Sequence, residues 1–216
     1  MSVEDEKRRA ARAAAALVEP GMRVGLGTGT TVAHLLAALA QRHVDALYVA
    51  SSPRTDAQAR ALGITTQPFD TIVRLDLAID GADQVAANGW LRKGGGGAHT
   101  REKLIANAAE RFVVIVDATK LVDELSGPVA LELLAFGLGA TVARVAPTTL
   151  RGGARSPDGG VLGDYRGDIT DPCSLAQRLS STPGVIEHGL FAPAMVSDVL
   201  VGEGAIVRRI SSGGHP

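Results

Sequence analysis

The amino-acid sequence predicts an α/β protein with a doubly wound, mainly parallel, Rossmann-like sheet and a smaller ferredoxin-like α+β domain. The first observation is composition, because 45% of the 216 residues are hydrophobic but only 3% are aromatic. A core built from Ala, Val, Leu and Ile suits the buried strands of parallel sheets. The second is an alternation of strand and helix patterns up to residue 127, and the third is a change of that rhythm afterwards.

The first part of the chain alternates short apolar runs with segments of helical spacing. The expected strands are Met22–Gly27, Leu47–Ala50, Leu75–Ile79 and Phe112–Val116. The expected helices are Val3–Val18, Thr30–Gln41, the segment from Pro53 to Gly63 and Thr100–Ala109. Ser52 is the expected N-cap of the third helix, since Pro53 suits a first helical position. Strands separated by helices of this length predict a mainly parallel sheet.

From about Pro128 the expected order is strand, helix, strand, strand, helix, strand, the ferredoxin-like pattern. The expected elements are Val129–Leu134, Gly139–Ala146, Leu150–Arg155, Val161–Tyr165, Asp171–Leu179 and Val185–Leu190. The segment Asp198–Ile210 is expected to return to the first domain. We therefore expect residues 1–127 and 199–216 to form the Rossmann-like catalytic domain and residues 128–198 the small domain.

Charge and composition argue against several classes of protein. The net charge is −1, from 22 Lys and Arg against 23 Asp and Glu, so no nucleic-acid partner is expected. Cys173 is the only cysteine and matches no zinc spacing. Met1–Arg12 lacks the apolar core of a signal peptide, and no apolar run approaches the roughly 18 residues of a membrane span. We expect a cytoplasmic protein without a membrane partner.

Three glycine- or aspartate-containing motifs are candidates for chemistry. Four consecutive glycines, Gly94–Gly97, follow Lys93 and precede a helical segment with Glu102; glycine runs mark a close backbone approach, or else a flexible linker. The segment Gly25–Thr31 combines glycines and threonines at a strand end and helix start, which suits phosphate or a plain tight turn. It is not a G-x-G-x-x-G motif and has no P-loop lysine. The third, Asp80-Gly81-Ala82-Asp83, ends a strand where open sheets bind ligands, or is an ordinary turn.

Taken in order, these motifs resemble those of the type A ribose-5-phosphate isomerase family. The resemblance continues in Ser51-Ser52 with Thr55, in Val116–Lys120 and in Pro183–Phe191, and it spans about Pro20 to Gly202. It implies an aldose–ketose isomerase of ribose 5-phosphate and ribulose 5-phosphate, with no cofactor and no metal. His99 is the lone metal-ligand candidate beside the site.

The resemblance also assigns residue roles. Glu102 is the implied base, Lys93 offsets the charge of an enediolate, and Asp80 helps to open the sugar ring. The expected substrate-binding residues are Thr28, Gly29, Thr30, Thr31, Asp80, Gly81, Ala82, Asp83, Lys93, Gly94, Gly95, Gly96 and Lys120. The family also implies a homodimer or homotetramer.

Two kinds of alternative remain open at the sequence level. Gln84 replaces a family carboxylate, and Ala130 and Leu133 also depart from the family pattern, which leaves a related sugar phosphate as an alternative substrate. A sugar-phosphate sensor domain shares this kind of fold, but only about twenty residues precede the first expected strand. A coenzyme A transferase-like enzyme gives Lys93 and Asp80 no role.

Overall fold

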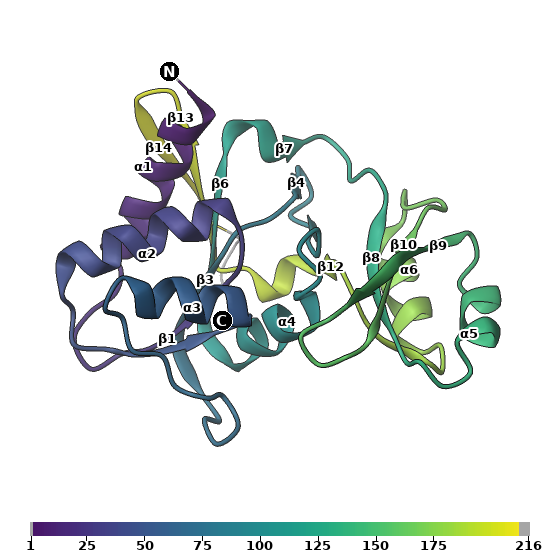
Figure 1. Ribbon diagram of the computed structural model, residues 1–216. Helices are drawn as coiled ribbons and strands as arrows, with labels where there is room; N and C mark the ends of the chain where they lie inside the picture. Colours follow the sequence, from purple (N-terminus) through teal and green to yellow (C-terminus); the bar gives the residue numbers. More distant parts are fainter. Residues whose placement is uncertain (1, 212–216) are drawn as a thin grey trace. The chain divides into compact units, whose positions relative to one another are not determined.

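The computed structural model describes residues 2–211, which form two compact units (Figure 1). Within that range, the first unit comprises residues up to 82, 101–121 and those from 194 onward. The second comprises residues 83–100 and 122–193. The domain boundaries expected from the sequence stay a prediction, and residues 212–216 of the expected first domain lie outside the described residues.

The first unit is built on a six-stranded sheet with the order β14-β13-β6-β3-β1-β2. Its strands are β1 (Arg23–Leu26), β2 (Leu47–Ala50), β3 (Leu75–Asp80), β6 (Ala109–Asp117), β13 (Asp198–Glu203) and β14 (Ile206–Ser211). All neighbouring pairs are parallel except β13 and β14, which form an antiparallel hairpin at one edge. The mainly parallel sheet predicted from the sequence is confirmed, and the segment after Asp198 supplies two of its strands.

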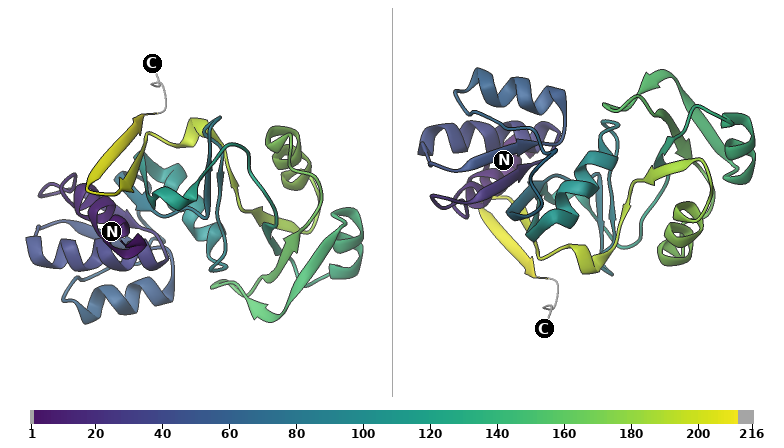
Figure 2. Two further views of the ribbon diagram at one scale, coloured as in Figure 1. Left: turned by 90° about the horizontal axis from the view of Figure 1, so that it is seen from above. Right: turned by 90° about the horizontal axis from the view of Figure 1, so that it is seen from below.

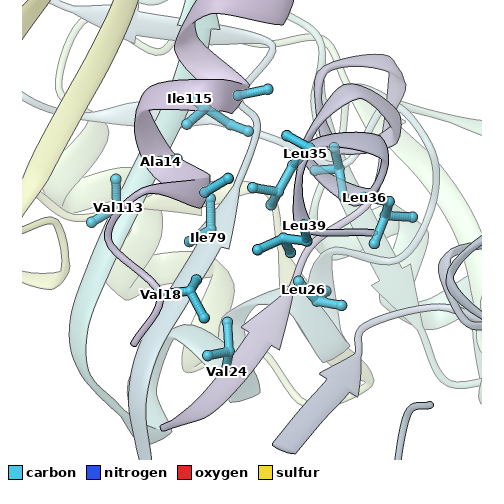
Figure 3. Packing of buried hydrophobic residues seen from close by; sticks show 14 of the residues in the cluster. Ala14, Val18, Val24, Leu26, Leu35, Leu36, Leu39, Ile79, Val113 and Ile115 are labelled. Atoms are coloured by element: carbon cyan, nitrogen blue, oxygen red, sulfur yellow. The ribbon is translucent and has the colours of Figure 1, made fainter. Parts of the chain in front are cut away.

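Helices cover both faces of this sheet. They are α1 (Val3–Ala15), α2 (Thr30–Arg42), α3 (Pro53–Ala61) and α4 (His99–Ala108). Ala14 of α1 and Leu35 and Leu39 of α2 pack against inward-facing strand residues such as Ile79 (Figure 3). Ile105 of α4 lies against the opposite face, where a Cβ on Gly25 would be 2.3 Å from its Cγ2 atom. The predicted doubly wound arrangement is therefore confirmed.

The second unit contains an antiparallel sheet with the order β11-β8-β10-β9. Its elements are β8 (Val129–Leu133), α5 (Leu138–Arg144), β9 (Thr148–Arg155), β10 (Val161–Tyr165), α6 (Pro172–Ser180) and β11 (Val185–His188). This sequence of elements confirms the predicted ferredoxin-like pattern. Both helices cover one face of the sheet (Figure 2). Val129, Leu131 and Leu133 point toward them, so Ala130 and Glu132 lie on the opposite face of the sheet.

A second, smaller sheet was not predicted from the sequence. Its strands have the order β12-β5-β4-β7: β4 (Gln84–Ala86), β5 (Leu91–Arg92), β7 (Leu121–Val122) and β12 (Leu190–Phe191). Strands of two or three residues are too short to show a periodicity of two. They matter for function because β5 leads directly into Lys93 and the glycines that follow.

One negative result applies to the described part of the chain. Between residues 2 and 211, no helix has both the length and the apolar composition needed to cross a membrane.

Candidate active site

Four loops of the first unit leave the sheet at the same edge. Neighbouring parallel strands end together, so the segments after β1, β2, β3 and β6 all start from the carboxyl edge. These segments carry Thr28–Thr31, Ser51–Ser52, Asp80–Ala82 and Lys120. Most residues singled out in this unit by the sequence therefore lie on one edge of one sheet.

The start of α2 has the features of an anion site. Gly29 is its N-cap residue, with a φ of 126° that favours glycine, and it has no side chain with which to cap the helix. The first-turn N–H groups are consequently left to another acceptor, and the partial positive charge of a helix start favours an anion. Thr30 is exposed and Thr31 half-buried in this first turn.

Thr28 belongs to a chain of hydroxyl groups inside the unit. Its Oγ1 donates to Ser52 Oγ over 2.9 Å, Ser52 Oγ donates to Thr55 Oγ1 over 3.0 Å, and Thr55 Oγ1 donates to the Gly27 carbonyl over 2.8 Å. Ser52 also accepts from the Thr55 N–H and so caps α3, as predicted. The Thr28 N–H donates to Asp80. Since both Thr28 donors are used within the unit, Thr28 supports the loop, and its contact with substrate stays a prediction.

Asp80 is fixed at the carboxyl end of β3. Its side chain is only 3% exposed, and its Oδ1 atom accepts from the N–H groups of Thr28 at 3.0 Å and Gly81 at 2.7 Å. The carboxylate occupies the space beside Gly27, where an added Cβ would lie 1.8 Å from Oδ1. The loop after β1 and the carboxylate after β3 therefore position each other.

Glu102 lies on the sheet-facing side of α4 and is 6% exposed. It precedes Ile105 by three residues, so the two side chains share one helix face, and Ile105 packs against Gly25. β6 starts directly after α4, and it runs parallel to β3. The start of α4, with Glu102, therefore points toward the carboxyl edge of the sheet. Lys120 ends the short helix η1 (Ala118–Lys120) beyond β6 and is half-buried.

In the second unit, the glycine segment lies against the face of the antiparallel sheet that carries Ala130 and Leu162. A Cβ on Gly94 would be 2.6 Å from the Ala130 Cβ, and one on Gly97 would be 2.5 Å from Leu162 Cδ1. Both glycines also have positive φ angles, 100° and 75°. The glycines are thus required by close approach and by backbone conformation, and the linker alternative is wrong.

Lys93 and Asp83 flank this segment. The Lys93 N–H donates to the Gly189 carbonyl over 2.8 Å, and its ammonium lies 5.4 Å from the centre of the Phe191 ring. Lys93 is 3% exposed, and burial of a cation on an aromatic face is a stabilising cation–π arrangement. Asp83 is half-buried, and its Oδ2 accepts from the Gly95 N–H over 3.0 Å.

His99, the candidate metal ligand, and Gln84, which departs from the family pattern, are both held by contacts within the second unit. The His99 ring is fully buried beside Gly94, with Nε2 3.4 Å from the Glu187 carbonyl. Among residues 2–211, no group of three or more His, Cys, Asp or Glu side chains is placed to hold a metal ion. The Gln84 amide donates to Ser126 Oγ over 2.6 Å and accepts from the Ser126 N–H and from Arg92.

Sequence reasoning missed three charged residues around the glycine segment. Arg151 on β9 donates to the carbonyls of Gly94 and Gly95, and Asp164 on β10 holds its guanidinium. Glu132 on β8 is 1% exposed and accepts from the hydroxyls of Thr100 and Ser156. Opposite charges on the two strands of a predicted hairpin were the available signal for the Arg151–Asp164 pair.

The fold is that of an α/β protein with an uncapped helix start and a buried Asp80 in the first unit and a buried Lys93 beside the glycine segment in the second. A family model described as ribose 5-phosphate isomerase A (phosphoriboisomerase A) matches residues 47–205. The chain belongs to this family, and it is an isomerase.

Individual relatives agree over nearly the whole chain. The ribose-5-phosphate isomerase A of Natronomonas pharaonis is 44% identical, covering 92% of this chain and 93% of the relative. That of Rhodopseudomonas palustris strain HaA2 is 40% identical over 95% of this chain and 97% of its own.

Solved structures agree with the fold. The ribose 5-phosphate isomerase A from Methanocaldococcus jannaschii has a TM-score of 0.91 at 31% identity, and the match covers 97% of this chain and 100% of that structure's chain. A D-ribose-5-phosphate isomerase in complex with phospho-erythronic acid has a TM-score of 0.91 at 33% identity, covering 98% and 100%. The family expected from the motifs is confirmed.

Proposed function

We propose that this chain interconverts D-ribose 5-phosphate and D-ribulose 5-phosphate through an enediolate, with Glu102 as the base. Full-length similarity to ribose-5-phosphate isomerase A proteins is the observation that carries the proposal. The proposal gives roles to residues of both units, and each role is argued from that residue's own surroundings.

Glu102 moves the carbon-bound proton. In the open-chain aldose, its carboxylate takes the proton from C2, the electron pair forms the C1–C2 double bond, and O1 gains negative charge. The same carboxyl then returns the proton to C1, and a proton passes from O2 to O1, which gives the ketose. A carboxylate that is 6% exposed is shielded from bulk water, so it can hold the proton between the two steps.

Lys93 and Asp80 assist this transfer. The Lys93 backbone is held by Gly189 and its buried ammonium lies over the Phe191 ring, so the side chain offers a preorganised positive charge to the enediolate oxygens. Asp80 is fixed through Oδ1, and we assign to it the proton transfer that opens the furanose ring. Asp83, Gly81 and Ala82 hold sugar hydroxyls in this proposal.

The phosphate end of the substrate is assigned to the start of α2. The first-turn N–H groups after Gly29 and the hydroxyls of Thr30 and Thr31 suit phosphate oxygens. Lys120, at the same sheet edge, adds a positive charge. A known relative is described in complex with phospho-erythronic acid, a phosphorylated sugar acid, which supports a sugar phosphate as ligand here.

The departure at Gln84 gives no reason to prefer another sugar phosphate. Its amide oxygen and nitrogen are both used by Ser126 and Arg92 within the second unit. Because both polar atoms of the Gln84 side chain are hydrogen-bonded within the unit, this side chain has little freedom to alter a ligand contact. Ribose 5-phosphate is therefore the substrate we propose.

The test replaces Glu102 by glutamine, which keeps shape and hydrogen bonding but removes the base. Turnover, followed as ketose formation from ribose 5-phosphate, should fall roughly 10²–10⁴-fold, the usual contribution of a general base. Calorimetric binding of phospho-erythronic acid should change little. The matched control is Glu110→Gln, which removes an exposed carboxylate paired with Arg74 and should leave turnover unchanged. More than half of normal turnover in Glu102→Gln would reject Glu102 as the base.

A further inference from the structure

The glycine segment makes a tight turn whose polar contacts are specific. The Gly97 N–H donates to the Gly94 carbonyl over 3.1 Å, which places Gly95 and Gly96 at the centre of the turn. The Gly94 carbonyl also accepts from Arg151 Nη1 over 2.9 Å, and the Gly95 carbonyl lies 3.4 Å from the same nitrogen. One guanidinium therefore contacts two successive carbonyls of the turn.

Arg151 is itself held rigidly. Its Nη2 and Nε atoms donate to Asp164, with Nη2 2.7 Å from Oδ1 and Nε 3.2 Å from both carboxylate oxygens. Both side chains are largely shielded, with exposed fractions of 21% and 16%. A planar guanidinium can bind a carboxylate on one edge and carbonyls on another, which an ammonium cannot do with the same geometry.

Peptide geometry turns these contacts into an orientation. In a trans peptide the carbonyl and the following N–H point in opposite directions. Because the carbonyls of Gly94 and Gly95 face Arg151, the N–H groups of Gly95 and Gly96 face away from it. The Gly95 N–H meets Asp83 Oδ2 at 3.0 Å. One peptide plane thus joins the Arg151 guanidinium to the Asp83 carboxylate.

The hydrophobic neighbours of the turn do not favour one orientation of its peptides, and the buried His99 ring also lies beside Gly94. Ala130 and Leu162 lie where Cβ atoms of Gly94 and Gly97 would be, so they require glycine at these positions. They are apolar, and an apolar surface accommodates either face of a peptide plane. Arg151 on one side and Asp83 on the other therefore both contribute to the direction of the N–H groups.

We propose that Arg151, held by Asp164, is a positioning residue that orients the Gly94–Gly96 peptides and thereby fixes Asp83 and the donor of Gly96 for substrate binding. The inference rests on the proposed roles of Asp83 and the glycine segment in substrate binding. It adds a residue pair from the antiparallel sheet of the second unit, far from the other site residues in the sequence.

The first experiment compares Arg151→Met, Arg151→Lys and Asp164→Asn with the control Arg155→Met. Arg155 lies on the same strand but is exposed and contacts the Gly159 carbonyl instead of the turn. For ribose 5-phosphate, Arg151→Met should lower kcat/KM about 10–100-fold, mainly by raising KM, since misplacement of a binding group has costs of this size. Lysine should restore only a small part of this loss, and Asp164→Asn should have the same effect as Arg151→Met to a smaller degree.

The second experiment is a double-mutant cycle with Asp83→Asn. If Arg151 acts through Asp83, the two losses in kcat/KM overlap, so the double variant is hardly worse than the poorer single one. Combined with Arg155→Met, the losses should simply multiply. Amide exchange of the peptide covering Lys93–Gly97 should become faster in Arg151→Met and stay unchanged in Arg155→Met.

Several outcomes would overturn the inference. Normal KM and normal exchange in a folded Arg151→Met protein would do so, and so would full rescue by lysine, which would make the role one of charge alone. If Arg151→Met lowers the thermal midpoint, Asp164→Asn and the exchange data decide. Loss of turnover in Glu102→Gln with normal kinetics in Arg151→Met would reject this inference and leave the proposed function intact. Normal turnover in Glu102→Gln would reject the proposed base whatever Arg151 does.

Discussion

Gly27 and Asp80 show how one missing side chain creates a place for another. The Asp80 carboxylate lies where a Gly27 side chain would begin, with 1.8 Å between the added Cβ and Oδ1. From the sequence we attributed the glycines of this loop to tight turning and phosphate binding. The structure adds a different reason, close packing against residues about fifty positions away, which no local pattern reveals. Gly25 has the same kind of reason, because Ile105 occupies its side-chain space.

The first prediction is that Gly27→Ala displaces Asp80. The new methyl group forces the carboxylate to turn away from the Thr28 and Gly81 N–H groups. Overpacking of this kind costs about 1–3 kcal/mol, and isomerase activity should fall together with the free energy of unfolding. Urea unfolding and steady-state kinetics measure the two effects.

The control for this prediction is Gly139→Ala on the exposed side of α5. No atom lies within 4 Å of the added Cβ, and the φ angle of Gly139 is not positive. Alanine should stabilise this helix by about 0.5–1 kcal/mol and leave activity unchanged. Equal behaviour of the two alanine variants would contradict the packing argument for Gly27.

At the scale of elements, one buried carboxylate on β13 joins the hairpin strand β14 to β6, in addition to the backbone pairing of β13 with β6. Asp198, which is 2% exposed, accepts from Arg209 at 2.7 and 2.9 Å, from Ser211 at 2.9 Å and from Arg111 on β6 at 3.1 Å. Burial raises the pKa of Asp198, but the hydrogen bonds from Arg209, Ser211 and Arg111 together hold it below its ordinary value of 3.8. The charged form is thus favoured by folding.

The second prediction follows from that direction. A carboxyl with a lower pKa in the folded state adds stability that is complete above about pH 3.8 and is lost as the pH falls through the folded value. Asp198→Asn should therefore lower the free energy of unfolding at pH 7 by about 1–2 kcal/mol, since it weakens hydrogen bonds to charged groups. The difference from the unmodified protein should shrink below about pH 3.8.

Urea unfolding at a series of pH values measures this difference. The exposed Asp70, changed to Asn, serves as the control and should stay within about 0.5 kcal/mol of the unmodified protein throughout. A difference for Asp198→Asn that is constant between pH 7 and pH 3 would mean that its charge is unimportant.

Most regular elements could be predicted, because each has a signal within its own segment. The strand Leu47–Ala50 and the helix starts at Thr30 and Pro53 agree with the structure residue for residue. The first helix was predicted to end at Val18 but ends at Ala15, since alanine-rich sequence continues without a breaker until Pro20. The sequence did not predict the small sheet of β4, β5, β7 and β12. Its short strands are defined by pairing between segments that are far apart in the chain, and they have no local pattern of their own.

At the scale of the whole molecule, the sequence predicted the candidate site residues that belong to motifs. It did not predict the residues that act by holding other residues in place. The roles of Glu102, Lys93 and Asp80 came from the family resemblance and remain proposals. Arg151, Asp164 and Glu132 could not be found in this way, because their partners are peptide carbonyls and hydroxyls that carry no sequence signature. The expected homodimer or homotetramer, the cytoplasmic location and the absence of a metal requirement stay predictions.

The last prediction concerns what the molecule recognises, and it uses Thr31 in the first turn of α2. If a phosphate binds this helix start, Thr31→Ala removes a hydroxyl donor far from the reacting carbons, so KM for ribose 5-phosphate should rise more than kcat falls. Some loss of kcat is still expected, because remote binding energy helps to position the sugar. Free ribose should be a very poor substrate of the unmodified protein, and the variant should treat it in the same way. Initial rates with ribose 5-phosphate, other aldopentose and aldohexose phosphates and free ribose measure both effects. If kcat/KM for another sugar phosphate exceeds that for ribose 5-phosphate by more than about tenfold, the isomerase mechanism stands and the proposed substrate is rejected.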